Sequence, residues 1–338
     1  MTPNSFLNKS KKFILAISCF ILLFILFQLL NFSSTGTDEK SQKDYFNGRF
    51  KTGGINLPKD LNFAGEKVPL NDFNIQESLD RELLINTYSP SQTLLLYKRA
   101  NRWFPVIEPL LKKYGIPDDF KYIAVIESGL TNSVSPAGAT GYWQMVDETA
   151  KSYGLIVDEE IDERYNMEKS TEAACKYFRE AYEKFRNWTL AAASYNIGVT
   201  GLETQLSKQR TTTYYDLFLN EETGRYLFRI LAIKDVLSRP SAYGYILGKK
   251  DLYPPIPTKK IQIDSSIGNL SEFALARGFN YKILKLLNPW LLSSYLNNTE
   301  RKTFYIHLPA QGVNIFAWEE FSSEKDTIRT DSIHSHEN

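Results

Sequence analysis

Residues 117–128 read Pro-Asp-Asp-Phe-Lys-Tyr-Ile-Ala-Val-Ile-Glu-Ser, and this segment is the most informative one in the sequence. A proline followed by two acidic residues suits the first turn of a helix, where the dipole is positive. Phe120, Ile123 and Glu127 follow one another at helical spacing, so they share one face. We therefore predict a buried helix, central to an all-α domain, with the carboxylate of Glu127 near its end.

A carboxylate at this position has two interpretations. Burial disfavours the charged form and raises the pKa of the group, which makes it a general acid near neutral pH. Alternatively, Glu127 is structural, either exposed at the helix end or paired with a buried arginine, since many buried carboxylates have no catalytic role. The helix alone does not decide between the two.

Composition excludes several classes of function. The chain has 338 residues, 43% of them hydrophobic, which is enough for a sizeable core and a smaller second domain. Lys and Arg number 40 against 39 Asp and Glu, so we expect no nucleic-acid partner. The two cysteines, Cys19 and Cys175, and three histidines near the C-terminus form no motif for a metal or a disulfide framework. We expect neither a metal nor a cofactor.

An uncharged apolar run at residues 13–30 is just long enough to span a bilayer as a helix. Three lysines precede it, which places residues 1–12 in the cytoplasm and the body of the chain outside it. We favour an uncleaved signal anchor in the inner membrane. A signal peptide cleaved near residues 33–36 and a lipoprotein modified at Cys19 are the alternatives, although Cys19 bisects the apolar run.

The body of the chain shows a change of pattern along its length. Residues 31–75 are polar and weakly periodic, and we interpret them as a tether, part-ordered near Phe63 to Phe73. Residues 76–250 have helical periodicity interrupted by breakers, among them Pro105 and the Gly-Ile-Pro sequence at 115–117. These patterns predict a compact helical domain after a tether.

A second module follows a proline-rich joint at residues 253–257. Within residues 258–310, strand-like alternation at 260–263 and 303–308 encloses two short helical patterns. This order predicts a small β-α-α-β domain. The polar residues 311–338 form a tail.

Motifs downstream of Glu127 carry a family resemblance. Residues 135–145 read Ser-Pro-Ala-Gly-Ala-Thr-Gly-Tyr-Trp-Gln-Met, residues 191–198 read Ala-Ala-Ala-Ser-Tyr-Asn-Ile-Gly, and residues 222–226 read Glu-Thr-Gly-Arg-Tyr. Their order and spacing after Glu127-Ser128 resemble the lytic transglycosylases of the soluble, goose-lysozyme-like type, most of all the membrane-bound D type. The resemblance covers residues 95–245 and implies a lysozyme-like all-α catalytic domain.

The resemblance also implies roles for individual residues. Glu127 is the catalytic acid and base. The other motif residues bind the glycan or support the site: Ser135 holds or polarises the substrate, Gln144 hydrogen-bonds in the cleft, Tyr195 positions Glu127, Asn196 supports the Tyr195 loop, and Glu222 contacts a sugar. Each also has a structural interpretation, as a core tyrosine, a turn residue or a helix-start residue. Val146-Asp147 and Ile197 depart from the family pattern, so the shape of the cleft stays open.

The matched motifs hold no second carboxylate next to Glu127, whereas most glycosidases use two. The resemblance therefore implies lytic cleavage of the β-1,4 bond between N-acetylmuramic acid and N-acetylglucosamine in peptidoglycan, with formation of 1,6-anhydro ends. Peptidoglycan strands and the membrane are the expected partners, and the bacterial cell envelope is the expected location. A goose-type muramidase and a catalytically inactive peptidoglycan-binding scaffold are the alternatives.

The second module resembles a LysM domain. Asn288-Pro289-Trp290-Leu291 and the closing Tyr-Ile-His-Leu-Pro at 305–309 carry this resemblance, although the usual Gly-Asp-Ser/Thr-Leu opening is degraded. The resemblance implies binding of glycans that contain N-acetylglucosamine. The alternative is that the module is a packing appendage of the catalytic domain.

Overall fold

The computed structural model describes residues 53–310. The apolar run at 13–30 and the tail at 311–338 lie outside these residues. Within the described part, no helix combines the length and apolar character that a membrane span needs.

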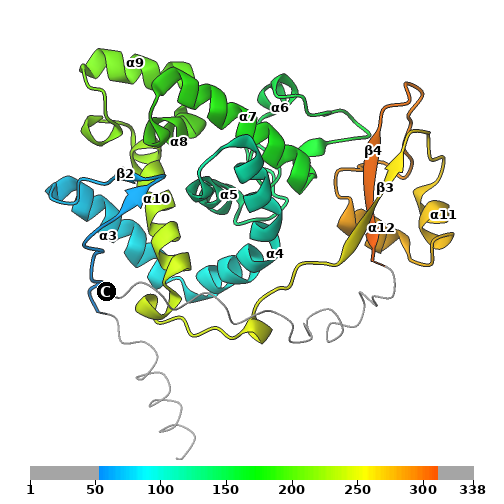
Figure 1. Cartoon of the computed structure of the whole chain (residues 1–338), viewed down its shortest axis with the longest axis horizontal. Coiled ribbons are helices and arrows are strands. Elements are labelled where there is room, and N and C mark those ends of the chain that lie inside the picture. The colour runs from blue at the N-terminus through cyan, green and yellow to red at the C-terminus, as the bar shows by residue number, and fades with distance from the viewer. Residues whose placement is uncertain (1–52, 311–338) are drawn as a thin grey trace, which may run out of the picture. The chain divides into compact units, whose positions relative to one another are not determined.

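The helical domain is built from eight α-helices in the described range and several short 3-10 turns (Figure 1). The α-helices are α3 (Phe73–Thr87), α4 (Pro90–Tyr114), α5 (Lys121–Ser128), α6 (Asp147–Ser152), α7 (Met167–Phe185), α8 (Trp188–Ile197), α9 (Val199–Gln209) and α10 (Glu221–Ser238). The 3-10 turns are η1 (Asp118–Phe120), η2 (Glu163–Tyr165), η3 (Tyr214–Asp216), η4 (Pro240–Tyr243) and η5 (Lys249–Asp251). The prediction of a mainly helical domain is confirmed.

Helix α5 is the predicted central helix. The η1 turn follows Pro117, α5 continues from it, and Gly129 ends the helix in the left-handed conformation. Ile123 and Ala124 are completely buried. The helix packs between α4 and α10, as Figure 1 shows, so Glu127 is delivered from the core of the domain.

Helix α4 differs from the sequence prediction. Pro105, expected to break the chain, lies inside this helix together with Pro109. Both prolines are exposed and lie four residues apart, so they share one face of the helix. The helix therefore loses two amide donors on an exposed face and not in the core, where unpaired carbonyl groups would cost more.

The end of the expected tether belongs to the helical domain. A small hairpin, β1 (Asn62–Phe63) and β2 (Glu66–Lys67), places the Phe63 ring 5.2 Å from that of Phe120 in the core. The Glu66 carboxylate accepts hydrogen bonds from the first two amides of α8. The structure thus assigns residues 62–67, at the edge of the stretch expected to be part-ordered, to the helical domain. A hairpin this short contributes too few apolar positions to show a period in the sequence.

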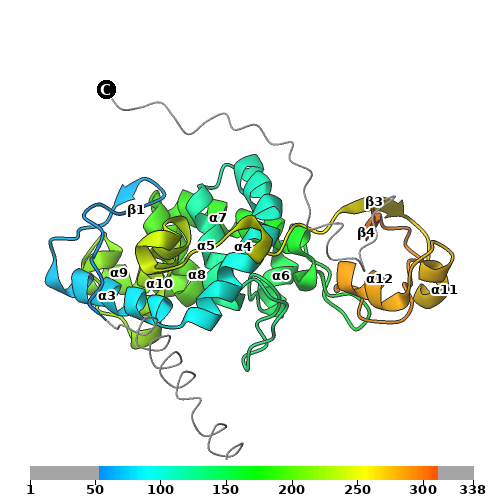
Figure 2. The ribbon, with the colours of Figure 1, turned by 90° about the horizontal axis from the view of Figure 1, so that it is seen from below.

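The second module has the predicted β-α-α-β order. Its elements are β3 (Thr258–Ile263), α11 (Leu270–Leu275), α12 (Tyr281–Leu287) and β4 (Phe304–Pro309). The strands pair antiparallel, with Thr258 opposite Pro309 and Ile263 opposite Phe304. Both helices lie on one face of the strand pair (Figure 2) and enclose a core separate from that of the helical domain.

A loop of the helical domain enters this second core. We call residues 156–163, between α6 and α7, the arm. Ile161 on the arm is 4% exposed and packs in the core of the second module. It forms a β-bridge with Leu291, and the amide of the next residue donates to the Trp290 carbonyl at 2.9 Å. The module is therefore packed on the helical domain and not merely linked to it by the proline-rich joint.

Candidate active site

Glu127 lies at the end of α5 and is partly buried. Its Oε1 accepts a hydrogen bond of 2.5 Å from the hydroxyl of Tyr226, a residue of α10 that is 1% exposed. Arg229, one turn further along α10, donates to the carbonyl of Ile126 at 2.7 Å. The carboxyl group is therefore fixed by a buried neutral donor, while the neighbouring guanidinium is engaged by the backbone.

Burial raises the pKa of the Glu127 carboxyl above its ordinary value. The Tyr226 hydrogen bond and the Arg229 charge act in the opposite direction, and the Glu222 charge adds to the increase. Desolvation outweighs the stabilising contacts, so the net pKa is raised. Glu127 therefore holds its proton to a higher pH than an exposed glutamate, as a general acid requires.

The resemblance gives Tyr195 the role of positioning Glu127, but its hydroxyl does not bond to the carboxyl group. Its hydroxyl donates instead to the carbonyl of Trp143 at 2.8 Å. The Glu127 charge nevertheless adds to burial in raising the pKa of Tyr195, so the two groups are neighbours. Tyr226, to which we assigned no role from the sequence, is the bonded partner. Its position in the Glu-Thr-x-x-Tyr motif was the only local signal for it.

The loop of residues 135–145 is fastened beside Glu127. Ser128, next to the carboxylate, donates from its hydroxyl to the Tyr142 carbonyl at 2.7 Å. Gln144 has a φ of 50° and donates its side-chain amide to Ser133 and Gly141 carbonyls at 2.9 and 2.8 Å. The nitrogen of this amide therefore shapes the loop.

The remaining predicted residues lie around this loop and α10. Ser135 accepts from the Ala139 amide at 3.0 Å, as the turn-residue interpretation expects. Asn196 is partly exposed near the end of α8, and Glu222 is exposed in the first turn of α10. The charge of Glu222 acts on Glu127, and the charge of Glu127 acts on both Tyr195 and Tyr226.

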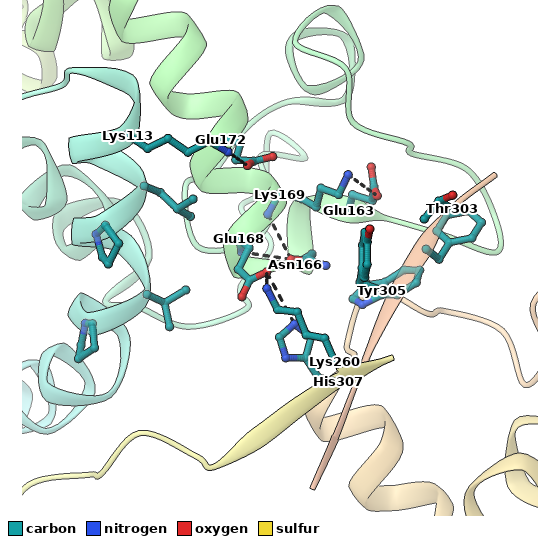
Figure 3. Close-up of a pocket in the computed structure, with 16 residues that line it drawn as sticks. Lys113, Glu163, Asn166, Glu168, Lys169, Glu172, Lys260, Thr303, Tyr305 and His307 are labelled. Carbon is teal, nitrogen blue, oxygen red and sulfur yellow. Dashed lines mark hydrogen bonds and ion pairs between the residues drawn. The ribbon is translucent and has the colours of Figure 1, made fainter. Parts of the chain in front are cut away.

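A separate cavity of about 540 Å³ lies between α4, α7 and the second module (Figure 3). Charged groups from both sides line it, with Glu168 of α7 opposite Lys260 and His307. None of the sequence-predicted site residues lines this cavity. Among residues 53–310, no cluster of three His, Cys, Asp or Glu side chains could hold a metal ion.

Comparisons with known families match both domains. Residues 105–218 match the transglycosylase SLT domain, and residues 259–312 match the soluble lytic transglycosylase C-terminal LysM-like domain. Over 235 residues the chain is 27% identical to membrane-bound lytic murein transglycosylase D of Escherichia coli K12, and equally to that of strain O6:H1. The alignment covers 68% of this chain and 50% of each relative, so the chain spans about half the length of these curated relatives.

Two solved structures are similar over part of the chain. An inactive mutant of lytic transglycosylase Slt from Pseudomonas aeruginosa shares 18% identity, with a TM-score of 0.33 over 41% of this chain and 24% of that one. The 70 kDa soluble lytic transglycosylase from Escherichia coli shares 19% identity, with a TM-score of 0.36 over 59% of this chain and 40% of that one. From its family matches, the chain contains a transglycosylase SLT domain, within which Glu127 lies, followed by a LysM-like domain of the soluble lytic transglycosylase C-terminal type.

Proposed function

We propose that the protein is a peptidoglycan lytic transglycosylase with Glu127 as its catalytic acid and base. The observation that carries this proposal is one carboxyl group, within the SLT domain, that is bonded to a buried tyrosine and has a raised pKa. The substrate is the β-1,4 bond between N-acetylmuramic acid and N-acetylglucosamine. The biological role is remodelling or turnover of the cell wall.

The proposed reaction uses Glu127 twice. The protonated carboxyl donates its proton to the glycosidic oxygen, and the bond from that oxygen to C1 of N-acetylmuramic acid breaks. The N-acetyl group of the same sugar stabilises the positive charge at C1. The carboxylate then removes the proton of the C6 hydroxyl, whose oxygen bonds to C1 and closes the 1,6-anhydro ring. The carboxyl ends protonated again, no water is consumed, and a pKa near the working pH suits both steps.

We propose the following roles for the surrounding residues. Tyr226 orients the Glu127 carboxyl, and Tyr195 holds the loop through the Trp143 carbonyl. Ser135, Gln144, Asn196 and Glu222 contact or frame the glycan. The contacts of Ser135 and Gln144 within the loop support a framing role for these two residues.

A goose-type muramidase is the second candidate because a second carboxylate lies within electrostatic reach. Glu222 is exposed, and its charge acts on Glu127. In an inverting or retaining glycosidase, the second carboxylate activates water or attacks C1. If Glu222 had that role, the products would carry reducing ends and would be heavier by one water.

We also propose that residues 13–30 anchor the chain in the inner membrane, with residues 1–12 in the cytoplasm and the catalytic body in the periplasm. The apolar run and the lysines before it support this placement. The relatives' name, membrane-bound lytic murein transglycosylase D, agrees with it. A cleaved signal peptide or lipidation at Cys19 would place the body in the same compartment.

Digestion of purified peptidoglycan sacculi with the full-length chain tests the enzymatic function. We expect mass spectrometry to find anhydromuropeptides with the wild type, and a loss of several orders of magnitude with Glu127→Gln. Near-normal release by that variant would remove Glu127 from the mechanism. Reducing-end products that disappear in Glu222→Gln would establish the muramidase instead.

The folding control for Glu127→Gln follows from the pKa. Burial disfavours the charged carboxylate, so the folded state binds the proton of Glu127 more tightly than the unfolded state does. The contribution of this group to stability therefore falls as pH rises from the ordinary glutamate pKa through the raised one. We expect the neutral glutamine to be tolerated at pH 7, and thermal unfolding of both proteins checks this.

A further inference from the structure

We propose that Arg164 is a positioning residue that couples the LysM-like module to the loop of residues 135–145 beside Glu127. The module thereby helps to hold the loop beside Glu127 in place, in addition to any binding of glycan. The activity measurement in the test rests on the proposed function. The structural argument rests only on the contacts of the arm and the loop.

The module end of the coupling is the arm. Its tip is preformed, because Asp158 Oδ1 accepts both the Glu160 and the Ile161 amides at 2.8 Å. The Glu160 carbonyl accepts the Leu292 amide of the module at 2.8 Å, and Ile161 fills the module core. The tip of the arm is held by its own hydrogen bonds, and Ile161 is packed in the module. A movement of the module should therefore move the arm as a unit, because packed groups do not shift independently.

Arg164 lies where the arm returns to the helical domain, and its side chain is 11% exposed. Its Nε and Nη2 donate to the Asp162 carboxylate at 3.0 and 2.8 Å. Its Nη1 donates to the carbonyls of Gly138 and Met145, both at 3.2 Å. One planar guanidinium thus connects the arm to two points of the loop, Gly138 and Met145, and a lysine ammonium cannot reproduce this fork.

The loop and the Arg164 backbone are also in direct contact. A Cβ atom on Gly141 would lie 2.1 Å from the Arg164 carbonyl oxygen, so the two backbones touch without a side chain between them. On its other side the loop accepts two hydrogen bonds. The Ser128 hydroxyl donates to the Tyr142 carbonyl, and the Tyr195 hydroxyl donates to the Trp143 carbonyl. A shift of Arg164 therefore reaches the two groups that flank Glu127.

A second contact between the module and the helical domain is weaker. Lys260 and His307 of the module approach Glu168 of α7, with nitrogen to oxygen distances of 2.5 and 3.8 Å (Figure 3). The side chains of Lys260 and Glu168 are 46% and 32% exposed, and ion pairs in water contribute little. The apolar and backbone contacts of the arm are therefore the stronger connection.

Hydrogen–deuterium exchange on the full-length chain tests the coupling without reference to activity. We expect Arg164→Ala and Ile161→Ala to accelerate exchange in residues 134–145 about tenfold or more, because charged donors make the stronger hydrogen bonds. Exchange in the buried middle of α10 should stay at the wild-type rate in both variants. The matched control is Glu159→Ala, at an exposed arm residue that makes no hydrogen bond to the loop or the module in the described part of the chain.

The kinetic readout separates positioning from folding. With soluble glycan strands as substrate, we expect both variants to lower kcat about tenfold and to change KM less than about threefold. Arg164→Lys keeps a positive charge beside Asp162, so it should restore the melting temperature but not the loop protection or kcat. Full recovery by lysine would mean that charge alone is needed, and the positioning role would be wrong.

Two further results would overturn the coupling. The first is an Ile161→Ala variant in which exchange is faster at residues 286–296 but unchanged in the loop. The module would then be loosened without any effect on the loop. The second is continued protection of residues 286–296 in the harsher Ile161→Asp, because the arm would then not hold the module. If the wild type releases no anhydromuropeptides, the proposed function fails, and the exchange data still decide the coupling.

Discussion

At the scale of single residues, the choice of donor to Glu127 sets the chemistry. An arginine in direct contact would hold the carboxyl in its charged form and lower its pKa. A buried tyrosine fixes the position of the carboxyl with a smaller electrostatic effect. Arg229 is close enough to act on Glu127, but its guanidinium donates to the Ile126 carbonyl. The site therefore keeps Glu127 oriented and still able to carry a proton.

Replacement of Tyr226 by phenylalanine tests this arrangement. The hydrogen bond lowers the pKa of Glu127, so its loss should raise that pKa further. Because the first step needs the protonated carboxyl, the basic limb of the pH–rate profile should move to higher pH. We also expect kcat to fall about tenfold or more, since a hydrogen bond to a charged group contributes ~1.5–3 kcal/mol. The measurement is the pH dependence of anhydromuropeptide release.

The matched control for this prediction is Tyr195→Phe. It removes an equivalent hydroxyl, whose bond goes to the Trp143 carbonyl. The rate should fall in this variant, but the basic limb should stay in place, since this hydroxyl does not bond to the carboxyl. A shift of the limb in Tyr195→Phe and none in Tyr226→Phe would reverse the two assignments.

The sequence points to Glu127 but not to its bonded partner, and the reason is physical. Glu127 belongs to a periodic apolar stripe, and local spacing shows such a stripe directly. The bond to Tyr226 joins residues 99 positions apart, and only the packing of α5 against α10 brings them together. The matched motifs contain three tyrosines, Tyr142, Tyr195 and Tyr226, and the sequence does not tell which hydroxyl reaches the carboxyl.

At the scale of elements, the loop of residues 135–145 depends on one close approach of two backbones. Gly138 and Gly141 both have left-handed φ angles, of 78° and 80°. A Cβ on Gly141 would meet the Arg164 carbonyl, whereas a Cβ on Gly138 would have no neighbour within 4 Å. A side chain at Gly138 would meet only the energetic cost of the left-handed backbone conformation. A side chain at Gly141 would meet the same cost and also a steric clash with the Arg164 carbonyl.

Alanine at each position tests this difference. We expect Gly138→Ala to lower the free energy of unfolding by roughly 1–2 kcal/mol, the cost of a left-handed residue with a Cβ. Gly141→Ala should cost about 1–3 kcal/mol more, because the added atom overlaps a packed backbone. Denaturant unfolding at pH 7 measures both. Equal losses would show that Arg164 yields to the added methyl group.

The sequence predicted the elements whose hydrophobic residues recur at a regular spacing. It did not predict the segments that are held in place by contacts with distant residues. The order of strand, helix, helix and strand in the second module is confirmed because alternation and helical spacing are local properties. The arm has no period of its own, so Ile161 gave no sign that it enters another core. Pro105 failed as a breaker because its face of α4 is exposed.

At the scale of the whole molecule, each domain has its own core and the second one is closed by a buried asparagine. Asn288 donates to the carbonyls of Leu284 and His307 at 2.9 and 2.7 Å, and accepts the His307 amide at 2.7 Å. This one side chain connects the end of α12 to strand β4. The Asn-Pro motif of the module thus has a structural explanation that does not involve a ligand.

Asn288→Ala should open the module and leave the helical domain intact. The loss leaves the amide and the carbonyl of His307 without the Asn288 partner, which costs roughly 2–6 kcal/mol at about 1–3 kcal/mol for each group. Hydrogen–deuterium exchange should accelerate in β3 and β4 and stay slow in α10. Asn297→Ala, at an exposed position in the same module, is the control and should change neither.

The arm has a consequence for how such chains could be recombined. A domain that completes its own core can be moved between proteins, but the module at residues 258–310 borrows Ile161 from outside its sequence. Transplanted alone, it would carry an unfilled hole and an unpaired strand position at Leu291. The unit with a complete core is therefore the module together with residues 156–163. A continuous gene fragment that encodes both segments must also encode the helices between them.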